Sequence, residues 1–181
     1  MDATKYLTRI GFSGTVEVSL KCLAELQACH QLAVPFENLD VFLKRKKVLE
    51  VEVLFERIVE EKRGGWCCEL NGLFAWLLEN LGFSVRKVSA SYFNPEKNEF
   101  NGMFDHMALI VFLGEQEYLT DVGWGNINAH YMPIRYVIQY IHARIPVIIF
   151  IIFIQAIQYL TIHVLDSLIT QFTSSQEDST N

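Results

Sequence analysis

The stretch RGGWCCELNGLFAWLLENLG, residues 63–82, contains the change of pattern on which the fold depends. Gly64 and Gly65 interrupt the chain, and from Cys67 onward apolar residues recur three or four positions apart, as on one face of a helix. The positions on this face are Leu70, Phe74, Leu77, Leu78 and Leu81. Gly82 follows where a left-handed residue commonly ends a helix. We therefore predict a helix that begins near Cys67 and ends before Gly82.

After Gly82 the apolar residues recur about every second position. The segment FSVRKVSASYF, residues 83–93, alternates Val85, Val88 and Tyr92 with polar residues and is typical of a strand. A turn-rich loop, NPEKNEFNG, precedes the apolar run HMALIVFL at 106–113, and GEQE then predicts a hairpin into YLTDVGWG. Helices followed by antiparallel strands indicate an α+β fold rather than a parallel βαβ array.

The residues before Gly64 are predicted to be mainly helical. Residues 16–30 place Val16, Leu20, Leu23 and Leu26 at helical spacing, and residues 50–61 are amphipathic. Between them lies QLAVPFENLDVFLKRKK, which contains a proline and two turn-forming residues. We predict a loop there, followed by a short extended piece.

Composition narrows the class of protein. The chain has 181 residues, of which 51% are hydrophobic and 20% charged, so a large core is expected rather than disorder. Its net charge of −6 gives no support to nucleic-acid binding, which requires a basic surface. The first residues, MDATKYLTRIGF, lack the pattern of a secretory signal.

The four cysteines are irregularly spaced, and no C-x-x-C pair indicates zinc. We expect free thiols in a reducing cytoplasm and no bound metal.

Cys67 is the strongest candidate for a reactive thiol. A free thiol is only slightly ionised at neutral pH, and the unpaired N–H groups at a helix N-terminus favour the thiolate. Arg63 adds positive charge nearby. The alternative is that a cysteine at the start of a buried helix is only a packing residue, and local spacing does not separate the two interpretations.

A thiol nucleophile also needs a base. Among five histidines, only His106 begins a predicted strand, and Asp121 ends the strand that pairs with it. Asp121 could then hold one imidazole nitrogen and leave the other for the thiol, as in a catalytic triad. The alternative is that a histidine at a strand end is only a surface or core residue.

Four motifs in register resemble the arylamine N-acetyltransferases, of the vertebrate type. They are VPFENLD at 34–40, RGGWC at 63–67, the strand beginning at His106 and DVGWG at 121–125, and the N-terminal YLTRIGF also fits. The resemblance covers residues 1 to about 133. It implies a helical bundle, then a β-barrel and a lid, in an enzyme that transfers acetyl from acetyl-coenzyme A to an arylamine or hydrazine nitrogen by a ping-pong mechanism.

The resemblance also implies roles for individual residues. Cys67 is the nucleophile, His106 the base and Asp121 the orienting acid, while Cys68 packs on the helix. Arg63 and Glu37 are expected to support the site as a pair. Coenzyme contacts are expected at Gly102, Gly123, Trp124 and Gly125, and acceptor contacts at Phe36, Phe93 and Phe104.

The resemblance implies three parts: a helical domain (1–82), the start of a barrel (83–133) and a divergent apolar tail with a polar end (134–181). Residues 145–165 carry no formal charge and have the length of a membrane span. Membrane contact is not favoured, because Gln155, Gln158 and His163 would need partners in lipid.

Relatives are longer, so we expect an incomplete barrel and a poorly soluble, nearly inactive monomeric chain. The alternatives are a transglutaminase-like or papain-like Cys-His-Asp hydrolase, and an inactive membrane-associated fragment.

Overall fold

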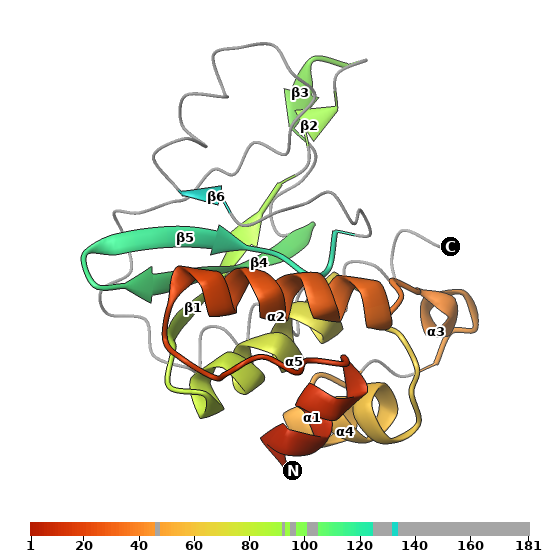
Figure 1. The fold of residues 1–181 in the computed structure, drawn as a ribbon. Helices are drawn as coiled ribbons and strands as arrows, with labels where there is room; N and C mark the ends of the chain where they lie inside the picture. The colour runs from red at the N-terminus through yellow and green to blue at the C-terminus, as the bar shows by residue number, and fades with distance from the viewer. Residues whose placement is uncertain (46–47, 92, 95–96, 101–104, 125–131, 134–181) are drawn as a thin grey trace.

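The computed structural model describes residues 1–45, 48–91, 93–94, 97–100, 105–124 and 132–133. Its first part is helical and its second part is built of strands (Figure 1). The helices are α1 (Ala3–Arg9), α2 (Leu20–Ala33), α3 (Leu39–Phe42), α4 (Val51–Phe55), the π-helical turn η1 (Glu56–Glu60) and α5 (Cys67–Asn80). The strands are β1 (Ser84–Ala90), β2 (Phe93–Asn94), β3 (Glu99–Phe100), β4 (His106–Leu113), β5 (Gln116–Thr120) and β6 (Met132–Pro133).

The strands confirm the predicted antiparallel arrangement. The larger sheet has the order β1-β4-β5-β6, and each neighbouring pair is antiparallel. The register places Ala90 opposite His106 and Leu109 opposite Thr120. β2 and β3 form a separate two-stranded hairpin within the predicted loop. The fold is thus a mixture of helices and an antiparallel sheet.

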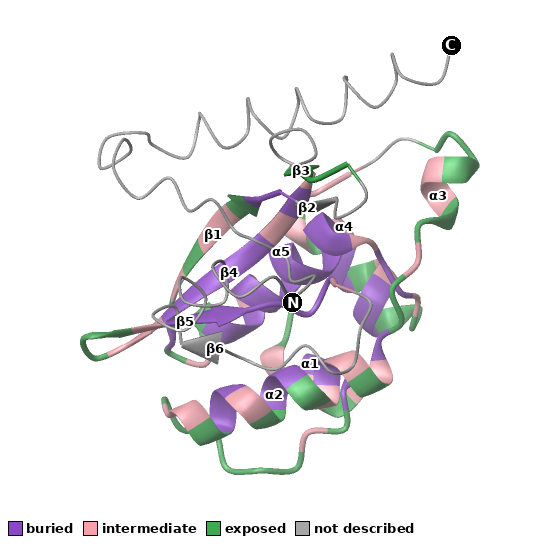
Figure 2. Ribbon diagram, turned by 90° about the horizontal axis from the view of Figure 1, so that it is seen from above, coloured by how far each residue is buried: buried purple, intermediate pink, exposed green. Residues whose placement is uncertain are grey.

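The main core lies between the helices and one face of the sheet. Leu109 and Val111 of β4 belong to this cluster with side chains of α1, α2, α4 and α5, whereas Ala108 and Ile110 belong to a smaller cluster. Because alternate residues of a strand point to opposite faces, β4 is buried on both sides. This burial accounts for its continuous apolar sequence. Figure 2 shows buried residues running through α5 and β4.

Helix α5 begins and ends as predicted. Its first residue is Cys67, and the Glu69 side chain accepts a hydrogen bond from the Trp66 backbone N–H at 3.2 Å, which is one half of a capping box. Gly82 has a φ of +92°, the left-handed conformation expected after the helix. The amphipathic segment 50–61 is also helical, as α4 followed by η1.

Two expectations about the N-terminal part were wrong in detail, and one helix was missed. The helix predicted over 16–30 is α2, which begins only at Leu20, because Ser19 caps it by accepting from the Cys22 N–H at 3.3 Å. Val16 lies outside it and is 42% exposed. The extended piece predicted after Pro35 is instead the short helix α3, and α1 was not predicted.

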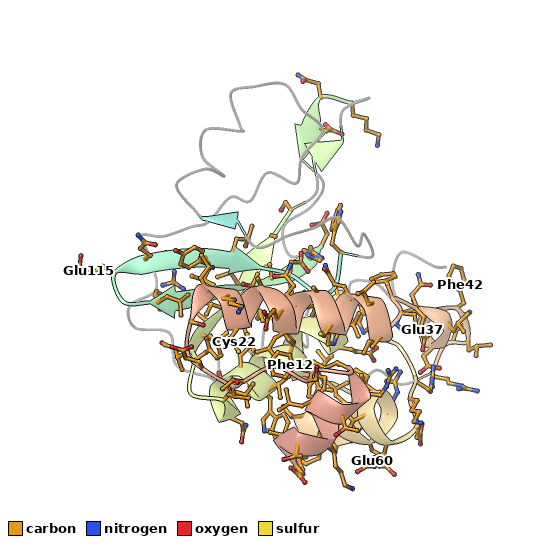
Figure 3. The ribbon with its side chains drawn as sticks, in the orientation of Figure 1. Phe12, Cys22, Glu37, Phe42, Glu60 and Glu115 are labelled. Carbon is orange, nitrogen blue, oxygen red and sulfur yellow. The ribbon has the colours of Figure 1, made fainter. Side chains whose placement is uncertain are left out.

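Helix α3 projects from the rest of the described structure. Figure 3 shows Phe42 of α3 on one side of the molecule and Glu115, in the β4–β5 turn, on the opposite side. No helix within the described ranges is long and apolar enough to cross a membrane. Residues 145–165 lie outside those ranges.

Candidate active site

The two glycines before α5 allow two distant segments to meet. Gly65 donates its N–H to the Pro35 carbonyl at 3.3 Å and accepts from the Glu37 N–H at 2.9 Å. A Cβ on Gly64 would lie 2.1 Å from the Pro35 oxygen, so no larger residue fits this backbone. The VPFENLD and RGGWC motifs are therefore neighbours in space, and this contact fixes the start of α5.

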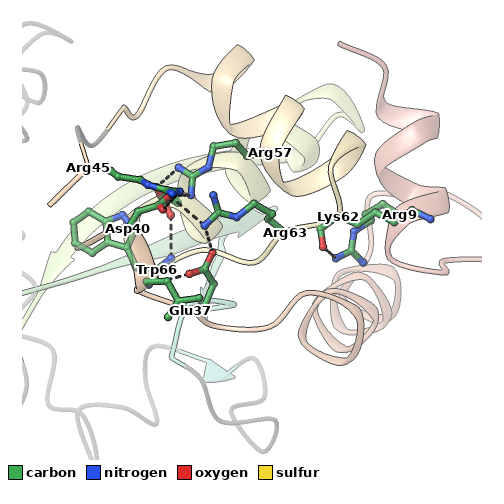
Figure 4. Close-up of polar contacts among 10 residues, drawn as sticks. Arg9, Glu37, Asp40, Arg45, Arg57, Lys62, Arg63 and Trp66 are labelled. Carbon is green, nitrogen blue, oxygen red and sulfur yellow. Dashed lines mark hydrogen bonds and ion pairs between the residues drawn. The ribbon is translucent and has the colours of Figure 1, made fainter. Parts of the chain in front are cut away.

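A cluster of charged side chains surrounds this junction (Figure 4). Arg63 pairs with Glu37 at 2.7 Å, as predicted, and with Asp40 at 3.2 Å. Arg57 of η1 bridges Asp40 at 2.9 Å and Glu69 at 2.8 Å. Burial raises the pKa of Glu69, while the pairing with arginines outweighs burial and lowers the pKa of Asp40.

Sequence reasoning missed Arg57, Asp40 and Glu69 in this cluster. The three residues come from different elements and no spacing pattern connects them. Their ion pairs nevertheless tie α3 and η1 to the first turn of α5. Glu69 is buried, and Arg57 and Asp40 are partly buried, so removing one partner would leave a charge uncompensated at a site with limited access to water.

The sheet register brings His106 and Asp121 together. Their Nε2 and Oδ2 atoms are 2.6 Å apart, and both residues are buried. Leu109 faces Thr120, so continuing the register puts Asp121 opposite Ala108, two residues from His106 along β4. Such diagonal neighbours share one face of a sheet and lie within reach of each other. The predicted His–Asp contact at this end of the hairpin is confirmed.

Cys67 is buried at the first position of α5, and its pKa is lowered to about 5. A hydrogen bond with Cys68 is the largest cause; burial opposes it, and His106 adds a hydrogen bond and a positive charge. Burial alone would lower the pKa of His106, but Asp121 and Cys67 outweigh burial and raise it to about 10. These directions favour the thiolate form of Cys67 and the imidazolium form of His106.

Asn71 is a further residue of this network that sequence reasoning did not single out. Its Nδ2 donates to Asp121 Oδ1 and to the Met107 carbonyl, both at 2.8 Å, and its Oδ1 accepts from the Val122 N–H at 3.0 Å. Asn71 follows Cys67 by four residues, so both lie on one face of α5. That spacing was the available signal: an asparagine one turn after the nucleophile on the same face of the predicted helix.

The acid-bearing turn packs directly against α5. A Cβ on Gly123 would lie 2.6 Å from Cys67 Cα and 2.8 Å from Asn71 Nδ2, so a side chain would force the turn away. The Gly123 N–H donates to Asp121 Oδ1 at 2.8 Å. The Trp124 ring stands edge-on to the His106 ring, with centroids 5.3 Å apart and planes at 85°. Both residues thus border the His106–Asp121 pair.

The remaining predicted contact residues are only partly described. Phe36 is 45% exposed and bridges to Gly65 through its backbone. Phe93 belongs to β2, where only its backbone is described. Gly102, Phe104 and Gly125 lie outside the described residues. Within the described part of the chain, no group of three or more His, Cys, Asp or Glu side chains could hold a metal ion.

Comparison with known proteins places these observations in a family. The sequence profile of the N-acetyltransferase family matches residues 19–172, and so runs past residue 133, where the motif resemblance ended. The pineal gland isozyme NAT-10 of arylamine N-acetyltransferase from Gallus gallus is 35% identical over 138 residues, which cover 76% of this chain and 48% of that protein. This chain thus spans about half the length of the curated relatives it matches.

Solved structures agree with the sequence comparison. The arylamine N-acetyltransferase of Nocardia farcinica superposes with a TM-score of 0.68 at 34% identity, covering 75% of this chain and 48% of that one. The Mycobacterium marinum enzyme in complex with CoA superposes with a TM-score of 0.61 at 34% identity, covering 67% and 46%. The chain belongs to the arylamine N-acetyltransferase family.

Proposed function

We propose that this chain transfers an acetyl group from acetyl-coenzyme A to the nitrogen of an arylamine or hydrazine, with Cys67 as the acetyl carrier. One observation carries the proposal: His106 is held 2.6 Å from Asp121 beside the thiol at the start of α5. A cysteine, a histidine and a carboxylate in this order provide a nucleophile, a proton carrier and a group that fixes the imidazole.

The reaction would proceed in two transfers. In the first, the Cys67 thiolate attacks the acetyl carbonyl carbon, the thioester bond of the coenzyme breaks, and His106 gives its proton to the departing coenzyme thiolate. In the second, the amine attacks the carbonyl of acetyl-Cys67, His106 accepts the amine proton, and the Cys67 thiolate leaves. His106 thus alternates between acid and base while Asp121 holds one ring nitrogen.

The coenzyme and acceptor contacts remain proposals. We assign Gly102, Gly123, Trp124 and Gly125 to the coenzyme. Binding of the coenzyme by this chain is supported by the relative from M. marinum, which was solved in complex with CoA. Phe36, Phe93 and Phe104 are assigned to the acceptor. Besides this proposed role, position 123 needs a glycine because a Cβ there would lie too close to Cys67 Cα.

The finer organisation is likewise proposed. It comprises a helical bundle over 1–82, the start of a barrel over 83–133 and an apolar tail over 134–181, in a cytoplasmic monomer. The expectations of low solubility and slow turnover stay predictions.

A turnover assay on the full chain tests the proposed function. With acetyl-coenzyme A and an arylamine, coenzyme release should show a ping-pong dependence on the two substrates, however slow the rate. Cys67→Ser should abolish it, whereas Cys22→Ala, which truncates a buried cysteine of α2, should retain it. Release of ammonia or cleavage of peptide substrates without any acetyl transfer would favour the hydrolase alternative and refute the proposal.

A further inference from the structure

The two adjacent cysteines of α5 are in contact through their sulfur atoms. Cys67 Sγ lies 3.9 Å from Cys68 Sγ, within the range for a hydrogen bond between sulfurs, and both residues are buried. Neither cysteine belongs to the two apolar clusters of the described structure. The sequence-based interpretation of Cys68 as a packing residue therefore leaves this contact unexplained.

The chemistry of thiols and thiolates decides which sulfur donates the hydrogen bond. A thiolate can only accept a hydrogen bond, whereas a neutral thiol can donate its S–H proton. Cys67 has the favourable position for the charge, because His106 hydrogen-bonds its sulfur and adds a positive charge beside it. With the charge on Cys67, Cys68 is the donor of this hydrogen bond.

We propose that Cys68 is a positioning residue that donates its S–H to the Cys67 thiolate and so keeps the nucleophile ionised. The direction of the Cys67 pKa agrees with this geometry, since the hydrogen bond with Cys68 is the largest single cause that lowers it. The inference rests on the proposed function of Cys67 as nucleophile. It gives the second cysteine at the start of α5 a role beside the nucleophile.

A disulfide between the two cysteines is a poor explanation of the contact. Cα atoms of consecutive residues are about 3.8 Å apart across a trans peptide. Disulfides commonly need a Cα separation of about 4.4–6.8 Å. Bridging the pair would therefore distort the first turn of α5.

The test is the pH dependence of Cys67 alkylation in the full chain. Iodoacetamide labelling is followed by peptide mass spectrometry, which separates modification of Cys67 from modification of Cys68. Cys68→Ala should raise the midpoint of the Cys67 profile by about one pH unit, because a hydrogen bond to a charged group is lost. Cys68→Ser, which keeps a donor, should stay closer to the unsubstituted chain than to Cys68→Ala.

Two further variants separate the hydrogen bond from other effects. Cys22→Ala removes the same atoms from a buried cysteine of α2 and should leave the midpoint unchanged. In a His106→Gln background, Cys68→Ala should still raise the midpoint, because the contact between the sulfurs is direct. If Cys68→Ala does not fold, Cys68→Val fills the space without a donor and takes its place.

The outcomes decide the inference without recourse to catalysis. Equal midpoints for Cys68→Ala and Cys22→Ala would overturn it, and so would equal shifts for Cys68→Ala and Cys68→Ser. The readout is ionisation of the thiol, so failure of acetyl transfer with the predicted shift intact would refute only the proposed function.

Discussion

Asn71 Nδ2 lies 2.8 Å from Asp121 Oδ1, although 50 positions separate the two residues in the sequence. The contact joins the helix that begins with Cys67 to the turn that carries the acid. The same amide binds the Met107 carbonyl, next to His106, and the Val122 N–H. One buried side chain therefore holds the three proposed catalytic residues in a common frame.

Asn71→Ala is expected to destabilise the fold and the site together. It leaves three buried polar groups without this partner, so the free energy of unfolding should fall by about 3 kcal/mol. Denaturant unfolding measures this loss. Asn80→Ala is the matched control on the same helix, because Asn80 is exposed and bonds only the Trp76 carbonyl among the contacts identified. Equal losses in the two variants would contradict the role assigned to Asn71.

The ionisation of Cys67 should depend on His106. In the unsubstituted chain the alkylation rate should rise through a midpoint at about pH 5 and level off above it, following the lowered pKa of Cys67. His106→Gln removes the positive partner, so the midpoint should move up towards the ordinary thiol value of 9.0. An alkylation profile that is the same with and without His106 would contradict the proposed pairing of Cys67 with His106.

Substitution of Gly123 should disturb the site through backbone contact. The added Cβ of Gly123→Ala meets Cys67 Cα at 2.6 Å, so stability should fall by about 1–3 kcal/mol, with a loss of Cys67 reactivity. Gly72→Ala is the control, on the helix that begins with Cys67. Its added Cβ meets only Leu54 Cδ1, at 3.9 Å. That control should gain about 0.5–1 kcal/mol from helix propensity. Thermal unfolding and alkylation of both variants provide the comparison.

His30 should make the fold sensitive to acid. It is fully buried between Tyr6 and Phe74, its ring nitrogens have no hydrogen-bond partner among the described residues, and burial lowers its pKa to about 3. Below the ordinary value of 6.5 the unfolded chain takes up a proton that the folded chain does not, so stability falls as pH falls. The loss attributable to His30 should reach about 2 kcal/mol at about pH 5.

Comparison of variants isolates this histidine from other titrating groups. His30→Phe keeps the ring contacts, so its stability relative to the unsubstituted chain should improve on going from pH 7.5 to 5, whatever its packing cost. Tyr6→Phe removes a neighbouring buried hydroxyl that does not titrate there, and its relative stability should not change with pH. A relative stability of His30→Phe that is independent of pH would show that His30 does not cause the sensitivity.

Local patterns predicted the elements that position the site. The helical period after Cys67, the left-handed Gly82 and the apolar run of β4 are short-range signals, and all three are confirmed. The His106–Asp121 contact was predictable because a hairpin has a defined register. Where a signal was weaker, as at Val16 before the Ser19 cap, the helix boundary was wrong by several residues.

What escaped prediction depends on long-range contacts. Arg57 joins Asp40 and Glu69 across three elements, and Asn71 contacts Asp121 in the turn after β5, 50 positions along the chain. No local period encodes such partners, because each is chosen by the packing of the whole fold. Cys68 is a separate case: the resemblance implied packing, whereas its sulfur contacts that of the adjacent Cys67.

Acetylation of Cys67 tests the central claim most directly. The full chain is mixed with excess acetyl-coenzyme A without an acceptor, and its intact mass and peptides are measured. We predict the addition of one acetyl group, located on Cys67, and its absence in Cys67→Ser. An unmodified chain that retains a reactive Cys67 thiolate, or an acetyl group on another residue that persists in Cys67→Ser, would contradict the claim.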